Sequence, residues 1–135
     1  MAGMEKAERM LWNYRQNVKK ADELRMLAVQ LMSVRGQDYG AHTVNGVSDA
    51  VSEVVHRRIE LGKKIQKLEQ EIEAVESLKA SLPLNELDTG QMRGILVHRY
   101  MEHKEPDTVM REMGITKATY YRRKRELIEK AGEYV

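Results

Sequence analysis

The chain contains no cysteine and no phenylalanine, and it has only two prolines among its 135 residues. Without cysteine it cannot form a disulfide framework, a cysteine-ligated zinc or iron–sulfur site, or a thiol nucleophile. Aromatic residues make up only 5% of the sequence, which argues against a β-sandwich or β-barrel core. Scarce proline together with 33% charged residues is typical of a helix-rich chain.

Long apolar runs are also absent from the sequence. No stretch approaches the ~18 consecutive apolar residues of a membrane-spanning helix. The first residues lack the apolar core of a signal peptide. We therefore expect a cytoplasmic protein with no membrane partner.

Charge is present in both signs but is unevenly distributed. The formal net charge is only +2, yet residues 117–125 include five basic side chains and no acidic one. The positive field of the chain is therefore local and lies near the C-terminus.

Apolar residues at helical spacing predict an all-α protein. The first helix is expected over residues 4–34, where apolar side chains recur every three or four positions. A loop is expected over 36–48, which contains several glycines and an Asn-Gly pair. Ser48 then has the residue type of an N-cap for a second long helix over 49–81.

Heptads run along the second long helix, and eight of its ten a and d positions are apolar. The a positions are Val51, Arg58, Ile65, Ile72 and Lys79, and the d positions are Val54, Leu61, Leu68, Val75 and Leu82. This pattern predicts a long antiparallel helical hairpin that resembles a coiled coil. Because two helices alone bury only one stripe each, we expect a partner surface, as in a homodimer.

We therefore divide the chain into a helical hairpin, residues 1–82, for oligomerisation or protein interaction, and a C-terminal module, residues 83–135. The module is expected to begin with a helix over 89–103. Asp88 and Gln91 have the spacing of a capping box at the start of that helix.

The end of the sequence has the layout of a helix-turn-helix motif. A short helix that opens at Pro106 is expected to stop at Gly114, which can adopt a left-handed turn. Thr116 is then expected to cap a longer basic helix over residues 117–131.

The N-terminal part of this basic helix is the predicted DNA-binding surface. Small Ala118 would allow close approach to base edges, and Arg122 and Arg125 can make bidentate contacts that favour guanine. The other hydroxyl and basic side chains would lie beside phosphates. The predicted DNA-binding residues are Thr116, Lys117, Ala118, Thr119, Tyr121, Arg122, Arg123, Lys124 and Arg125.

Residues 95–128 resemble the region-4 module of sigma-70 factors. The resemblance is closest to sigma-like phage regulators related to late-gene and autolysin activators of Gram-positive phages. It is carried by Leu96, Arg99, Tyr100, Gly114, Ile115, Thr116, Thr119, Tyr121, Arg122 and Leu127. Met110 departs from the small alanine that is usual in such motifs, which bears on the angle between the two helices.

The remainder of the chain resembles a group of uncharacterised phage and prophage proteins. The likeness includes Leu24, Arg25, Leu27 and Ala28 and the start of the second helix at 47–51. These resemblances imply a DNA-binding regulator of phage or prophage transcription in the cytoplasm of a bacterial host cell.

The leading interpretation is a sequence-specific duplex-DNA-binding transcriptional regulator that forms a homodimer through its N-terminal helices. Residues 117–131 would enter the major groove. Two alternatives remain open. The first is a protein that binds RNA polymerase or a sigma factor and contacts DNA weakly. The second is a DNA-packaging component like a small terminase subunit, although those proteins usually place their DNA-binding part first.

We expect neither an enzyme nor a cofactor-binding or metal-binding protein. His98 and Glu102 share one helix face, but no third ligand is evident in the sequence. Ser48 and Ser52 have no evident histidine and acid partners that would make either of them a nucleophile. A glycine-rich phosphate-binding loop is not found either.

Overall fold

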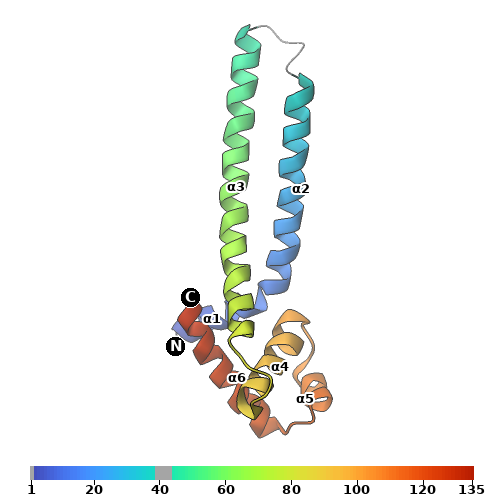
Figure 1. Ribbon diagram of the computed structural model, residues 1–135, viewed down its shortest axis with the longest axis vertical. Helices are drawn as coiled ribbons and strands as arrows, with labels where there is room; N and C mark the ends of the chain where they lie inside the picture. The colour runs from blue at the N-terminus through green and yellow to red at the C-terminus, as the bar shows by residue number, and fades with distance from the viewer. Residues whose placement is uncertain (1, 39–43) are drawn as a thin grey trace. The chain divides into compact units, whose positions relative to one another are not determined.

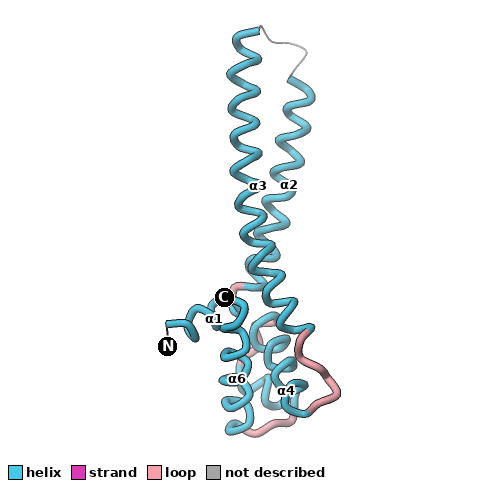
Figure 2. Tube along the Cα trace, turned by 60° about the vertical axis from the view of Figure 1, so that its left-hand side comes forward, coloured by secondary structure: helices cyan, strands magenta, loops and turns pink. Residues whose placement is uncertain are grey.

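The computed structural model describes residues 2–38 and 44–135, and within these ranges it consists of helices and loops without strands (Figure 2). The expected all-α class is therefore confirmed. The elements are α1 (Ala2–Trp12), α2 (Tyr14–Asp38), α3 (Val44–Ala80), α4 (Leu87–Ile95), the π-helical η1 (Leu96–Met101), α5 (Pro106–Met113), α6 (Lys117–Ala131) and the 3-10 helix η2 (Gly132–Tyr134).

Contacts divide the chain into two compact units. Unit 1 comprises Met1–Asn17 and Glu71–Val135, and unit 2 comprises Val18–Gln70. This grouping differs from the expected division after residue 82, because α1 and the end of α3 group with the C-terminal helices. The physical reason is that α1 packs against α6, η1 and η2.

Unit 2 consists of parts of α2 and α3, which lie side by side (Figures 1 and 2). In the middle of α2, Arg25 forms an ion pair of 2.8 Å with Glu69 of α3. Further along α2, Leu31 lines the same groove as Leu61, which comes earlier in α3. The two helices therefore run in opposite directions.

Burial along α3 in unit 2 follows the predicted heptads. Between residues 52 and 70 every a and d position is half-buried, and every other residue is exposed. These half-buried positions are Val54, Arg58, Leu61, Ile65 and Leu68. Among the described side chains of unit 2 only Ala21 is fully buried, so the pair of helices leaves its apolar stripe half open.

The loop expected over 36–48 is shorter in the structure, because α2 reaches Asp38 and α3 begins at Val44. Ser48 therefore lies inside α3, and its expected role as the N-cap is wrong. Extending an existing helix by one residue costs less than starting a new one, so a helix can continue through unfavourable residues. The central part of the expected loop, residues 39–43, lies outside the described residues.

The single helix expected over residues 4–34 is divided at Asn13, which lies between α1 and α2. The Trp12 ring stacks on the His103 ring, with centroids 4.0 Å apart, and Nε2 of His103 lies 2.9 Å from the Trp12 carbonyl oxygen. The Arg99 guanidinium lies 4.7 Å from the centre of the Trp12 ring. These contacts join residues about ninety positions apart, which helical periodicity does not reveal.

The core of unit 1 draws apolar side chains from α1, the end of α3, α4, η1, α5 and α6. Its buried residues are Ala7, Leu11, Val75, Leu78, Leu82, Met92, Ile95, Leu96, Tyr100, Val109, Tyr120, Leu127, Ile128 and Ala131. The helix expected over residues 89–103 corresponds to α4 and η1, and it changes from α-helical to π-helical at Leu96. This core fixes the inner faces of the last two helices.

Two tyrosines of unit 1 are held in their neutral form. Burial raises the pKa of Tyr14 to about 12, aided by the hydrogen bond of 2.9 Å that its hydroxyl donates to Glu76. Burial also raises the pKa of Tyr100, whose hydroxyl donates to Glu8 over 2.7 Å. The pKa of tyrosine in an unfolded chain is about 10, so the folded protein holds these protons more tightly than the unfolded chain.

We therefore expect the free energy of unfolding to be insensitive to these tyrosines below about pH 10 and to fall as the pH rises from about 10 to 12. Urea denaturation between pH 8 and 12 measures this decline, and tyrosinate absorbance measures the ionisation. Tyr14→Phe should make the decline shallower. Ionisation of every tyrosine near pH 10 in the folded protein would contradict the prediction.

Candidate nucleic-acid interface

The junction between α5 and α6 is set by two local features. Gly114 adopts the left-handed conformation, with φ 66° and ψ 36°, and its N–H donates to the Arg111 carbonyl over 3.3 Å. Two residues later, Oγ1 of Thr116 accepts a hydrogen bond of 3.2 Å from the backbone N–H of Thr119. The helix end at Gly114 and the N-cap at Thr116 are thus found where the sequence predicts them.

Gly114→Ala is expected to lower the free energy of unfolding by about 1–2 kcal/mol, because a left-handed backbone strains an L-residue with a β-carbon. A β-carbon at this position would meet no atom within 4 Å, so the loss would come from the backbone conformation alone. Gly114→Asn should lose less, since asparagine tolerates this conformation better. Urea denaturation of both variants tests the prediction, and equal losses would contradict it.

One face of α6, its inner face, is buried. Tyr120, Leu127 and Ala131 are fully buried, and Ile128 is nearly so. The helix packs through this face against α4 and α1. This packing leaves the opposite face of α6 directed away from the core.

That opposite face carries most of the residues predicted to contact DNA. Thr116, Lys117, Ala118, Tyr121, Arg122 and Arg125 are all exposed. Thr119 is half-buried, and its hydroxyl accepts a hydrogen bond of 3.0 Å from the hydroxyl of Thr116. We call the exposed set, together with Thr119, the α6 outer face.

Arg123 is predicted to lie beside phosphates, but in the structure its side chain is only 10% exposed. Its guanidinium donates from Nη2 to Asp88 over 2.7 Å and from Nε to Gln91 over 2.8 Å. It also pairs with Glu126 at 3.1 Å. Arg123 therefore joins α6 to the start of α4 and is not part of the α6 outer face.

The same contacts correct the predicted capping box. Asp88 and Gln91 both lie within hydrogen-bond distance of Arg123. The N-cap of α4 is Glu86, whose side chain forms no capping hydrogen bond. The spacing of a capping box is also the spacing of two side chains on one helix face, and here that face binds a guanidinium.

Lys124 is also drawn toward the fold. Its Nζ lies 3.3 Å from the carboxylate of Glu8 on α1, and its side chain is only 27% exposed. Burial alone would raise the pKa of Glu8, but the hydroxyl of Tyr100 and the ammonium of Lys124 together lower it. Lys124 also lies 5.8 Å from the centre of the Tyr121 ring, and so connects the core with the edge of the α6 outer face.

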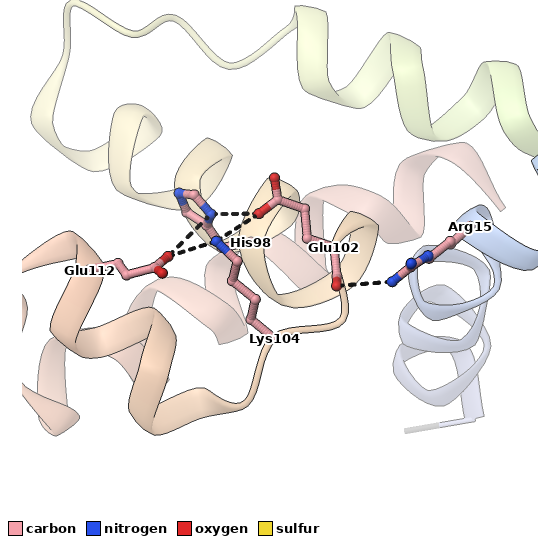
Figure 3. Close-up of polar contacts among 5 residues, drawn as sticks. All are labelled: Arg15, His98, Glu102, Lys104 and Glu112. Carbon is pink, nitrogen blue, oxygen red and sulfur yellow. Dashed lines mark hydrogen bonds and ion pairs between the residues drawn. The ribbon is translucent and has the colours of Figure 1, made fainter.

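A second polar cluster joins the end of η1 to α5 (Figure 3). His98 lies 2.9 Å from Glu102, and Lys104 lies 3.1 Å from Glu102 and 2.9 Å from Glu112. Arg15 donates to the backbone carbonyl of Glu102 over 3.2 Å. The hydrogen bonds from His98 and Lys104 lower the pKa of Glu102, and the hydrogen bond to Glu112 raises the pKa of Lys104.

The sequence indicated only the His98 and Glu102 part of this cluster. Glu112 lies on α5, and nothing in the sequence indicates that its carboxylate contacts Lys104. This cluster holds α5 beside η1, whereas the contacts of Arg123 hold α6 beside α4. Both helices that flank the α5–α6 junction are therefore fixed to the rest of unit 1. Among the described residues, no group of three or more metal-ligating side chains is arranged to hold an ion.

A comparison with protein families matches part of the chain. The family described as "Protein of unknown function (DUF1492)" matches residues 71–131. No curated protein and no solved structure matches the chain. The match begins at Glu71, where unit 1 resumes, and ends with the last residue of α6.

The matched segment therefore contains α4, η1, α5 and α6 together with the end of α3, and it includes the whole α6 outer face. The description of the family assigns no activity. Separately, no helix in the described part of the chain has the length and apolar character needed to cross a bilayer.

Proposed function

We propose that this chain is a sequence-specific duplex-DNA-binding transcriptional regulator of phage or prophage type. In this proposal α5 and α6 act as a helix-turn-helix, and the N-terminal part of α6 enters the major groove. The observation that carries the proposal is the α6 outer face: its cationic and small side chains are exposed while the opposite face is buried.

The exposed side chains have the chemistry needed to read a duplex. Ala118 lies in the first turn of α6, where a small side chain permits close approach to base edges. Arg122 lies one turn further along α6 and Arg125 lies two turns further, and each can donate two hydrogen bonds to a guanine. Tyr121 can contact a base edge, a thymine methyl or a phosphate.

The remaining predicted residues have supporting roles. Lys117 is exposed at the start of α6, where its ammonium can pair with a phosphate. Arg123 and Lys124 fix the orientation of α6 through Asp88 and Glu8. The reading module is therefore residues 83–135 with α1 packed on α6, rather than residues 83–135 alone.

The regulatory part of the proposal rests on the resemblance of residues 95–128 to sigma-70 region 4. The protein would act in the cytoplasm of a bacterial host cell, as a homodimer formed through its N-terminal helices. Two-fold symmetry would place two reading modules on paired half-sites one helical turn apart. RNA polymerase is a second partner that this resemblance permits, and neither enzymatic activity nor a cofactor is part of the proposal.

Selection from a randomised duplex-DNA library at physiological salt tests the proposal. The wild-type chain should enrich a defined motif, and a repeated half-site would give the spacing of the dimer. The double variant Arg122→Ala/Arg125→Ala is the matched control, because both side chains are exposed. The control should lose the motif while retaining its helical content.

Other outcomes favour the alternatives. Salt-sensitive binding without an enriched motif, shared by the wild-type chain and the control, would overturn sequence-specific reading by α6. Co-purification with RNA polymerase without a DNA footprint would then indicate an interaction protein. A mass corresponding to eight or more copies would instead indicate a packaging component.

A further inference from the structure

Unit 2 has a groove between α2 and α3 with a volume of about 410 Å³. Its apolar part is formed by Leu27, Leu31 and Leu61. Leu27 is 48% exposed although it lies beside the half-buried stripe of the two helices. An apolar groove flanked by charged residues is a typical site for association with another surface.

The charges on the α3 side of this groove alternate in sign. Arg57, Glu60 and Lys64 line the groove, and Glu53 lies on the same helix face one turn before Arg57. The four residues are spaced by four, three and four positions, which aligns them along one stripe of a helix. All four are exposed. The stripe therefore reads negative, positive, negative, positive, and we call it the α3 charge stripe.

An alternating stripe of this kind is complementary to a second copy of itself that runs in the opposite direction. With a two-fold axis midway between Arg57 and Glu60, Arg57 faces Glu60 of the second copy, and Glu53 faces Lys64 of the second copy. The symmetry repeats both contacts, giving four pairs of opposite charge. A parallel arrangement in register would instead place like charges opposite each other.

We propose that the groove between α2 and α3 is the surface on which a second copy of this chain packs, antiparallel along α3, with Arg57 opposite Glu60 and Glu53 opposite Lys64. The expectation of a homodimer comes from the proposed function, whereas the surface and its register rest on unit 2 alone. The product is a bundle of four helices, two from each copy.

Affinity and register have different sources in this dimer. The second copy covers the leucines of the groove and the half-buried heptad positions, and removal of this apolar surface from water drives association. Exposed ion pairs contribute little energy each, and in the structure Arg57 pairs within its own helix with Glu53 at 2.8 Å. The charge stripe therefore selects the antiparallel register and disfavours other partners.

Sedimentation equilibrium of the full chain over a range of concentrations tests the proposal. The wild-type chain should reach the mass of a dimer. Arg57→Glu alone, and Glu60→Arg alone, each place like charges at two contacts, so each should raise the dimer dissociation constant at least about tenfold. An equimolar mixture of the two variants restores opposite charges at both contacts, so it should form a heterodimer.

A matched pair of apolar variants tests the groove itself. Leu27→Asn changes a residue that lines the groove, whereas Val29→Asn changes a 63% exposed residue of the same helix that does not line it. The first should weaken the dimer at least about tenfold, and the second should leave it unchanged. Circular dichroism checks that both variants keep the helical content of the wild-type chain.

A wild-type chain that stays monomeric at all concentrations would overturn the proposal. So would a dimer whose dissociation constant is unaffected by Leu27→Asn, or a variant mixture that fails to associate although the wild-type chain does. The samples in these measurements contain no DNA, and none of the substituted residues lies on α6. Failure here therefore leaves DNA reading by α6 untouched, and loss of DNA reading leaves the dimer surface untouched.

Discussion

Replacement of both Arg122 and Arg125 by alanine is expected to reduce affinity for the selected duplex by about 100-fold. Each bidentate contact to a guanine contributes about 1–3 kcal/mol, and about 1.4 kcal/mol corresponds to a factor of ten. Both side chains are exposed, so the free energy of unfolding should change by less than about 0.5 kcal/mol for each substitution. Fluorescence anisotropy with labelled duplexes measures the affinity.

Charge and geometry can be separated by Arg122→Lys, which keeps the positive charge but loses the planar group that makes two parallel hydrogen bonds. This variant should lose affinity for the selected duplex and keep its affinity for random duplex. Lys130→Ala, which removes an exposed positive charge from the last turn of α6, is the control for charge alone. Equal losses of affinity on selected and random duplexes for all of these variants would contradict base reading by α6.

The parts of the site that follow from neighbouring residues could be predicted from the sequence. Pro106, Gly114 and Thr116 set the start of α5, its end and the start of α6, and each acts through its own backbone or side chain within one turn. The buried face of α6 follows from helical spacing for the same reason. Local chemistry is sufficient when both partners of a contact lie within a few residues.

The division of the first long helix at Asn13 could not be predicted in this way. The apolar pattern continues through this position, so periodicity alone indicates one helix. What distinguishes α1 is its set of distant partners: Glu8 contacts Tyr100 and Lys124, and Trp12 stacks on His103. None of these partners is closer than about ninety residues in sequence, and each contact depends on the completed core.

The role of Arg123 was missed for a related reason. A run of basic residues gives no sign of which member has an acidic partner elsewhere in the chain. Arg123 lies between the outer and inner faces of α6, and its partners Asp88 and Gln91 are more than thirty residues away. The spacing of Asp88 and Gln91 predicts a helix cap, and this local pattern gives no sign of a distant guanidinium partner.

Arg123→Ala is expected to lower the free energy of unfolding by about 2–3 kcal/mol, the largest stability change that we predict. The substitution removes hydrogen bonds and ion pairs to Asp88, Gln91 and Glu126 from a guanidinium that is 10% exposed. The loss is limited because Asp88 is 65% exposed and regains water when its partner is removed. Urea denaturation measures the change.

Two further variants locate the source of this loss. Arg123→Lys should recover little stability, because one ammonium cannot replace a planar group that reaches three partners. Asp88→Asn should cost less than Arg123→Ala, since it removes one charge from an exposed side chain and leaves the contacts to Gln91 and Glu126 in place. An Arg123→Lys variant as stable as the wild-type chain would contradict the geometric part of this account.

Arg122 and Arg123 are adjacent and chemically identical, so their variants separate folding from recognition. Arg122→Ala should lower DNA affinity without a change in stability. Arg123→Ala should lower stability, and its DNA affinity should fall only under conditions in which the fold is partly lost. If Arg123→Ala kept full stability and lost DNA affinity, its guanidinium would act on DNA directly, as its place in the basic run first suggested. The orientation of α6 would then have to differ from the one that buries this side chain against α4.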